Sequence, residues 1–265
     1  MWGKVFTKSS ILSALALSIS SVSFSASATT ILDGYVGAND NGHGDVIGDT
    51  ALFDTHGMTI SRSGNSLLIS IDSNFAGKGD DGLFGNLTNG NGIGYGDVFL
   101  SATWDPEGSA PYAGDDNSNG TVWSYGFNLF DRYMSENDQS NGHGTLYSLN
   151  SGNNDADILM SDDFLTSGIF RNGQEVAVDT VNGNVTALNQ GLWNIDTANN
   201  LINFEIDISN TSLLASSAIA VHWGPTCAND VIEGVSPVPV PAAVWLFVSG
   251  MAGLFGLSVR RKSRN

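Results

Sequence analysis

The chain has 265 residues, 27 of them acidic and ten basic, and a formal net charge of −17. Residues 29–241 contain only four Lys and Arg against all 27 Asp and Glu, a formal charge of −23, which argues against nucleic acid or anionic lipid as a partner because both need basic patches. The single cysteine, Cys227, excludes an intrachain disulfide and a cysteine-based zinc site, and we expect it to be buried.

The N-terminus has the pattern of a secretory signal peptide. Lys4 and Lys8 precede a short apolar run, Ile11 to Ile19, and small residues follow at Ala26-Ser27-Ala28. The apolar run is too short for a membrane-spanning helix, which needs ~20 residues. We therefore predict that residues 1–28 are a signal peptide, cleaved between Ala28 and Thr29.

The middle of the chain alternates apolar and polar residues with a period of two. This pattern is typical of half-buried strands. It is found at Leu67–Ile71, Val98–Trp104, Trp123–Leu129, Ile202–Ile208 and Ile219–Trp223. No amphipathic helical window of useful length is present, so residues 29–234 are expected to form one all-β domain, a two-sheet β-sandwich of jelly-roll type.

Asn-Gly pairs punctuate this region. They suit the type I′ hairpin turn, in which both central residues have positive φ. The pairs begin at Asn41, Asn89, Asn91, Asn119, Asn141, Asn172 and Asn182. Apolar residues flank the pair within Gly168–Val176, which predicts a hairpin there.

One acidic turn has the beginning of a calcium-binding loop. Asp115, Asn117 and Asn119 alternate along the chain and Gly120 follows, so three oxygen ligands are expected to point one way. The usual glutamate at the twelfth position is replaced by Gly126. Calcium binding and a plain Asn/Asp/Gly surface turn are the two interpretations.

Three aromatic residues near this turn have two interpretations. Trp104, Tyr112 and Trp123 are candidates for a platform on which a glycan stacks. Trp104 and Trp123 also occupy strand positions, where aromatic residues usually belong to the core.

The sequence lacks the common catalytic motifs. It has no Gly-x-Ser-x-Gly elbow, no His-Glu-x-x-His and no phosphate-binding loop. A glycosidase pair is recognised by the separation of two carboxylates in space, which the sequence does not give. We expect a non-enzymatic protein, with a carbohydrate-binding module or a secreted carbohydrate-active enzyme as the alternatives.

The C-terminus has three parts. Residues 235–241 hold three prolines and predict a stiff spacer. Residues 242–259 are 18 uncharged residues, about 27 Å as a helix and close to the hydrocarbon thickness of a bilayer. Residues 260–265 contain four basic residues, which remain in the cytoplasm, so the span is predicted to be a transmembrane helix with the β domain outside.

This tripartite segment resembles the PEP-CTERM class of bacterial sorting signals, and is closest to its VPLPA-type variant. The resemblance rests on Val238, Pro239, Val240 and Pro241, on the apolar span and on the basic tail. Val240 stands where the Pro-Glu-Pro form has glutamate. The resemblance implies recognition by an exosortase and cleavage near the Pro motif.

Two blocks in the domain are similar to a group of exported PEP-CTERM proteins with no assigned activity. The first runs from Gly96 to Trp123 and the second from His222 to Gly234, including Cys-x-Asn-Asp-x-Ile-Glu-Gly. This resemblance implies a family and no particular reaction. From the C-terminal signal and the lack of catalytic motifs we expect an exported cell-surface or extracellular-matrix protein of a Gram-negative bacterium, associated with exopolysaccharide in a biofilm. The precursor would be anchored in the inner membrane before processing.

Overall fold

A computed structural model describes residues 28–37, 42–79, 84–88, 92–134 and 142–238. Its elements in chain order are β1 (Thr29–Leu32), α1 (Thr50–Phe53), β2 (Thr55–Ser63), β3 (Ser66–Ser73), β4 (Val98–Ser101), β5 (Tyr125–Leu129), β6 (Gly142–Leu149), β7 (Ile158–Met160), α2 (Ser161–Phe164), β8 (Glu175–Val178), β9 (Val185–Asp196), β10 (Leu201–Asp207), the 3-10 turn η1 (Ser212–Ala215), β11 (Ala218–Trp223) and β12 (Ile232–Pro237). The all-β prediction is confirmed.

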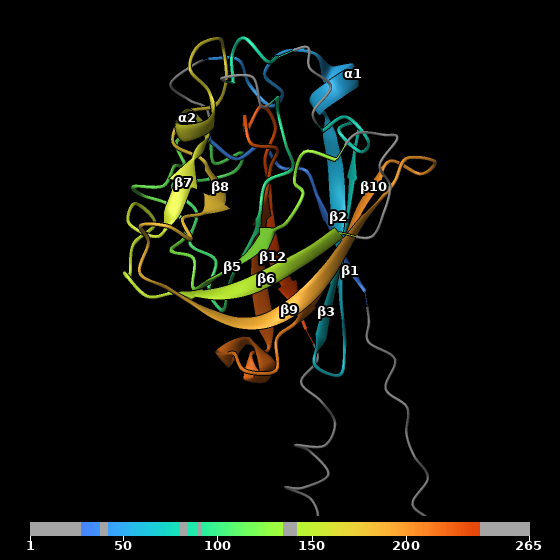
Figure 1. Ribbon diagram of the computed structural model, residues 1–265, viewed down its shortest axis with the longest axis vertical. Coiled ribbons are helices and arrows are strands. Elements are labelled where there is room, and N and C mark those ends of the chain that lie inside the picture. Colours follow the sequence, from blue (N-terminus) through green and yellow to red (C-terminus); the bar gives the residue numbers. More distant parts are fainter. Residues whose placement is uncertain (1–27, 38–41, 80–83, 89–91, 135–141, 239–265) are drawn as a thin grey trace, which may run out of the picture.

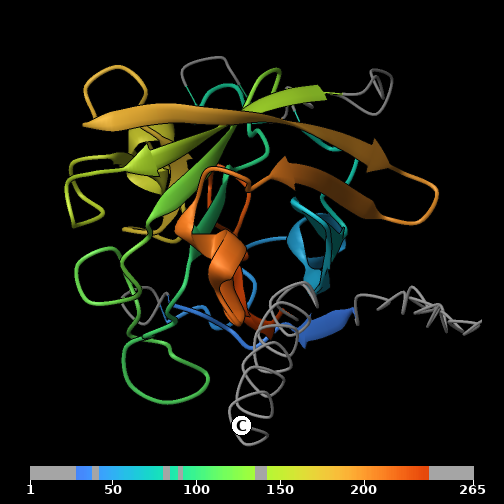
Figure 2. The ribbon, with the colours of Figure 1, turned by 90° about the horizontal axis from the view of Figure 1, so that it is seen from below.

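Ten of the strands form one antiparallel sheet. Their order is β1-β2-β3-β10-β9-β6-β5-β4-β11-β12, and β1 at one edge also contacts β12 at the other. The sheet curls around its core and nearly closes into a barrel, as the view from below shows (Figure 2). The predicted two-sheet sandwich is therefore wrong. Alternation of apolar and polar residues describes a strand with one buried face, and it is the same in a sandwich and in a barrel.

Glycines allow the sheet to bend where it is most crowded. The ring of Phe127 on β5 lies over Gly144 on β6 and Gly191 on β9, and a Cβ at either glycine would overlap that ring. The β6–β9 ladder also shifts register between Leu146 and Tyr147. Bulges and glycines are the usual devices by which a sheet turns a corner in a barrel.

One hydrophobic cluster fills the interior of the curled sheet. Leu67, Ile69 and Ile71 of β3 and Ile202, Phe204 and Ile206 of β10 belong to it, in agreement with the alternation predicted for these two strands, and β2 adds Met58 and Ile60. β4 differs, because all four of its residues are buried. Its outer face carries Phe99, which packs with Trp123, Val178 and Ala220 in a second cluster beneath β7 and β8. A two-stranded sheet thus covers one side of the barrel (Figure 1).

The turns differ from the expected ones. The predicted hairpin within Gly168–Val176 is wrong, because β8 pairs with β7 and α2 lies between them in the chain. A two-residue hairpin turn does occur at Gly64-Asn65, where Gly64 has φ +61°. The two turn residues occur in the order Gly-Asn, so the search for Asn-Gly pairs did not identify this turn.

The first and last strands place the two ends of the domain at one pole. β1 and β12 lie side by side, and Asp33, just after β1, is close to Asp230, just before β12. The strands therefore run in opposite directions, and β1 begins where β12 ends, at the lower end in Figure 1. β12 includes Val235, Ser236 and Pro237, which the sequence assigned to a spacer. In the described part of the chain no helix is both long and apolar enough to cross a membrane; the expected span at 242–259 and the signal segment 1–27 lie outside it.

Candidate functional site

A network of buried polar groups lies between the barrel and its two-stranded cover. His222 on β11 and Glu233 on β12 are opposite each other in the ladder, and their side chains are 3.1 Å apart from Nδ1 to Oε2. The other ring nitrogen, Nε2, donates to the backbone carbonyl of Glu175 on β8 at 2.8 Å. The histidine thus connects the barrel wall to the cover.

The loop that follows β4 is tied to the same carboxylate. Glu233 Oε1 accepts hydrogen bonds from the Trp104 indole N–H at 2.6 Å and from the Thr121 hydroxyl at 3.2 Å. Bonds to an ionised acceptor are among the stronger ones in proteins. One glutamate side chain therefore fixes both arms of the long loop between β4 and β5.

Two further carboxyl groups complete the network. Burial raises the pKa of Glu175 to about 7 even though His222 pulls it down, and burial together with Glu233 raises the pKa of Asp115 to about 7. Burial alone would lower the pKa of His222, but the Glu233 and Glu175 carboxylates outweigh it and raise that pKa. Glu175 and Asp115 therefore keep their protons to a higher pH than exposed carboxyl groups do.

These groups are inaccessible in the present conformation. Asp115, Glu175, His222 and Glu233 are all at most 6% exposed. A substrate would have to displace the Trp104 loop to reach them. Their hydrogen bonds to backbone and loop groups are those of a polar core that positions the loop.

The predicted calcium ligands are placed as an ordinary turn. The Asp115 carboxylate faces inward and accepts the Glu107 N–H at 2.7 Å. The Asn119 side-chain oxygen accepts the Asp116 N–H at 3.0 Å, and the Asn117 amide donates to Asp155. Each of the three side chains has a different partner, and that of Asp115 is buried whereas those of Asn117 and Asn119 are not.

Two of the three predicted stacking residues lie together. The rings of Trp104 and Tyr112 are 5.3 Å apart in an edge-to-face arrangement, and both are partly exposed. Trp123 is 2% exposed and packs against Phe99 and His222, so its faces are unavailable to a glycan. Only the smaller Trp104–Tyr112 pair is presented to solvent.

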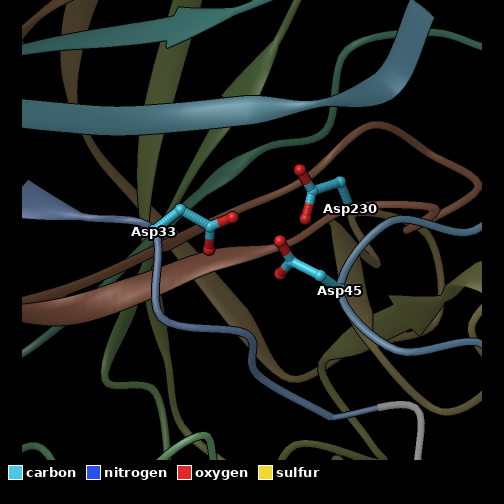
Figure 3. A group of neighbouring side chains, drawn as sticks. All are labelled: Asp33, Asp45 and Asp230. Carbon is cyan, nitrogen blue, oxygen red and sulfur yellow. The ribbon is translucent and has the colours of Figure 1, made fainter. Parts of the chain in front are cut away.

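A second acidic cluster lies where β1 ends and just before β12 begins. Asp33, Asp45 and Asp230 converge (Figure 3), with carboxylate oxygens within 4.8 Å of one another. Asp230 is held rigidly, because its two oxygens accept the N–H groups of Thr55 at 2.6 Å and of Val231 at 2.9 Å. The fold brings the three together from the end of β1, the next loop and the start of β12.

The electrostatics of this cluster are unusual. Burial and the Asp33 charge raise the pKa of Asp230 to about 8, and burial and the Asp45 charge raise that of Asp33 to about 6. Arg171 is the nearby cation; its guanidinium donates to the backbone carbonyls of Val36 and Asp45. With all groups ionised, three carboxylates and one guanidinium leave a charge of −2.

Carboxylate oxygens are the ligands that calcium prefers, and a divalent cation would balance that charge. Asn229, beside Asp230 in the chain, has a buried side-chain oxygen with no hydrogen-bond partner. Asp33, Asp45 and Asp230 are therefore the described residues best placed to hold a metal ion, and Arg171 is the competing counter-ion.

Sequence reasoning missed both clusters. Glu175, Glu233 and Asp33 look like ordinary acidic residues, and only contacts between distant segments bury them. Asp230 and Glu233 do fall within the Cys-x-Asn-Asp-x-Ile-Glu-Gly block, which was the one available signal. Cys227 in that block is buried, as expected, at 1% exposure.

The terminal motifs are described only in part. Thr29, predicted to begin the mature chain, is the first residue of β1, and Ala28 is exposed beside it. Val238 of the sorting motif is 2% exposed, and its N–H donates to the Ser217 carbonyl at 2.9 Å. Pro239, Val240 and Pro241 lie outside the described residues. Comparison of the chain with protein-family models, with curated proteins and with solved structures gave no match.

Proposed function

We propose that this chain is an exported, non-enzymatic surface domain of a Gram-negative bacterium that an exosortase processes and that associates with exopolysaccharide in the cell-surface or extracellular matrix. In its precursor form the domain is held outside the inner membrane by residues 242–259. The observation that carries the proposal is the pole shared by the beginning of β1 and the end of β12.

This shared pole is favourable for removal of both terminal segments. Cleavage between Ala28 and Thr29 leaves β1 whole, and β12 ends at Pro237, before the Pro239–Pro241 part of the motif. Val238, the last described residue, packs in the core, and its N–H is bonded to the Ser217 carbonyl. Neither processing event removes a strand residue.

The burial of the titratable groups supports a non-enzymatic role. The most perturbed carboxyl groups next to a histidine, Glu175 and Asp115, are almost inaccessible to solvent. Catalytic acids and bases must come within hydrogen-bond reach of a substrate. In this domain the Glu175 carboxyl group accepts a hydrogen bond from the Asn154 amide, and the Asp115 carboxyl group accepts one from the Glu107 N–H, both at 2.7 Å.

Processing is tested by mass spectrometry of protein recovered from the surface of the native host. The mature form is expected to begin at Thr29 and to lack residues 242–259. A variant with Pro239→Ala and Pro241→Ala is expected to remain in the membrane uncleaved. Pro237→Ala is the matched control, because Pro237 belongs to β12, and it should be processed normally.

One outcome would rule out the sorting assignment. If the surface-exposed form still contains Trp245 and Phe255, the chain is anchored by its C-terminal segment and no exosortase cuts it.

A second candidate function is carbohydrate binding without catalysis, and the Trp104–Tyr112 pair favours it. The pair is partly exposed, and the indole N–H of Trp104 is fixed on Glu233, so the ring is pre-organised. A glycan array with the wild type and Trp104→Ala tests it: binding should fall while the melting temperature shows a folded domain. A parallel hydrolysis screen addresses the enzyme alternative, since turnover of any polysaccharide would overturn the non-enzymatic proposal.

A further inference from the structure

A groove lies on the outer face of the barrel, and none of its lining residues belongs to either acidic cluster. It has a volume of about 340 Å³ and is lined by residues of β2, β3, β10 and β9. Ligand sites in proteins commonly have volumes of ~300–1,000 Å³, so the groove is at the small end of that range.

One side of the groove is a ladder of neutral hydrogen-bonding side chains. Thr59, Ser70, Asn203 and Asn194 stand in register on four neighbouring strands. Ser70 donates to the Asn203 oxygen at 2.7 Å, and the Asn203 amide donates to the Asn194 oxygen at 3.2 Å. Because strands lie ~4.8 Å apart, the row extends for roughly 14 Å.

The ladder retains unused hydrogen-bonding capacity. An asparagine amide has two donor hydrogens and a carbonyl oxygen with two lone pairs, and a hydroxyl accepts as well as donates. The bonds within the row use only part of this and orient the side chains of Ser70, Asn203 and Asn194. The row therefore offers donors and acceptors, already oriented, to a ligand that carries both.

The other side of the groove is apolar with one charge. Leu68 and Leu192 lie two residues before Ser70 and Asn194 in their strands, and Glu205 of β10 stands between them in the sheet. Leu192 is 43% exposed, which is unusual for a strand leucine, and Glu205 is held by the Ser66 hydroxyl at 3.2 Å. A ligand here meets apolar carbon on one side and hydrogen-bonding groups on the other.

The chemistry of the groove selects among ligand classes. Glu205 is its only charged residue, and the domain's formal charge of −23 repels polyanions. A peptide cannot add as a strand, because β3 and β10 are each paired on both sides. A neutral sugar has hydroxyl groups that donate and accept, and ring C–H groups that pack on leucine.

We propose that this groove binds a neutral polysaccharide chain, with Asn203 and Asn194 as the principal hydrogen-bonding residues. The inference deepens the proposed function, on which it rests, by assigning the matrix contact to the β2–β3–β10–β9 face and by specifying an uncharged glycan. Trp104 and Tyr112 belong to the loop between β4 and β5 and line no part of this groove.

The test is affinity electrophoresis of the full chain, purified in a detergent without a sugar headgroup. Gels contain dextran, galactomannan, hydroxyethyl cellulose or alginate. At least one of the three neutral polysaccharides should retard the protein, and the apparent Kd should rise at least tenfold in the double variant Asn194→Ala, Asn203→Ala. Gln190→Ala is the matched control, since Gln190 is an exposed amide on β9 outside the groove, and it should bind as the wild type does.

A second variant tests the groove independently, in case the double asparagine variant does not fold. Ser61→Phe puts a ring into the groove without removing either asparagine, and it should weaken retardation to a similar extent at an unchanged melting temperature. The inference is overturned if no neutral polysaccharide retards the protein, if alginate alone does, or if Trp104→Ala abolishes binding while the groove variants keep it. These results are separate from the mass-spectrometric test of processing, which can fail while the groove still binds.

Discussion

Stability of the domain is expected to fall as the pH rises from 5 to 7, and Asp230→Asn should remove much of that dependence. Asp230 is fully buried, and burial raises its pKa from 3.8 to about 8. Between these values the folded chain binds a proton that the unfolded chain has lost. The stabilisation is therefore complete below pH 3.8 and disappears as the pH passes through about 8.

The size of the effect follows from that proton. One extra proton in the folded state changes the free energy of unfolding by ~1.4 kcal/mol per pH unit, or roughly 2.5 kcal/mol between pH 5 and 7. For a domain of this size each kcal/mol moves the melting temperature by about 2–4 °C, so Asp230 alone should account for roughly 5–10 °C. The raised pKa values of Glu175, Asp115, Asp33 and His222 act in the same direction.

The assay is thermal unfolding of the full chain followed by circular dichroism at pH 5, 6, 7 and 8. Asp179→Asn is the control: slight burial opposes the change, but N–H groups of Asn182 and Val181 lower the pKa of Asp179. The stabilisation that Asp179 contributes is lost only as the pH falls below the usual carboxylate range. The melting temperature of Asp179→Asn should therefore change with pH from 5 to 8 in the same way as that of the wild type. A wild-type melting temperature that is flat or rises from pH 5 to 7, or an Asp230→Asn curve as steep as the wild type's, would refute the reasoning.

Three further predictions concern other parts of the domain. Cys227 is 1% exposed and burial raises the pKa of its thiol to about 12, so a thiol reagent should label it only after unfolding in urea; mass spectrometry that finds label on the native protein would disprove its burial. Gly144→Ala should lower the free energy of unfolding in urea by ~1–3 kcal/mol, because the new Cβ meets the Phe127 ring. Gly114→Ala is the control and should lower it by less than ~0.5 kcal/mol, because the space around Gly114 is open. Equal losses of stability in the two variants would show that the ring moves aside. Calcium at a hundred times its Kd should stabilise the wild-type domain by ~2.7 kcal/mol, and EDTA should reverse the resulting rise in melting temperature. The variant Asn119→Ala should keep this stabilisation and Asp45→Asn should lose it. If Asn119→Ala loses it instead, calcium binds at the Asp115–Asn119 loop predicted from the sequence.

The strands could be predicted from the sequence because alternation is a local property. Ile202–Ile208 and Leu67–Ile71 were placed almost as they occur in β10 and β3. That these two strands pair with each other is a contact between segments more than 120 residues apart, and nothing in either segment specifies it. The closure of the sheet depends on such pairings, so the architecture was beyond a local reading.

The candidate sites show the same limit. Asp115 and Trp104 were identified as notable residues, but their roles depend on Glu233, which holds the Trp104 loop from the far end of the chain. Trp123 sits beneath a two-stranded cover whose existence follows from the β7–β8 pairing. Residue type identified polar and aromatic side chains that could take part in a site. Only the tertiary fold determined which of these side chains are buried.

The pairing of β12 has a mechanical consequence. If the domain is held through its C-terminal end, hydrodynamic drag pulls β12 along its own axis, past the neighbouring β11. Six pairs of residues join these strands, from Ala218 opposite Pro237 to Trp223 opposite Ile232, and a load along the strand is shared among them. Bonds that share a load must break together, whereas a pull across the ladder would break them one by one. A tether at Val238 therefore loads the barrel in its stronger direction.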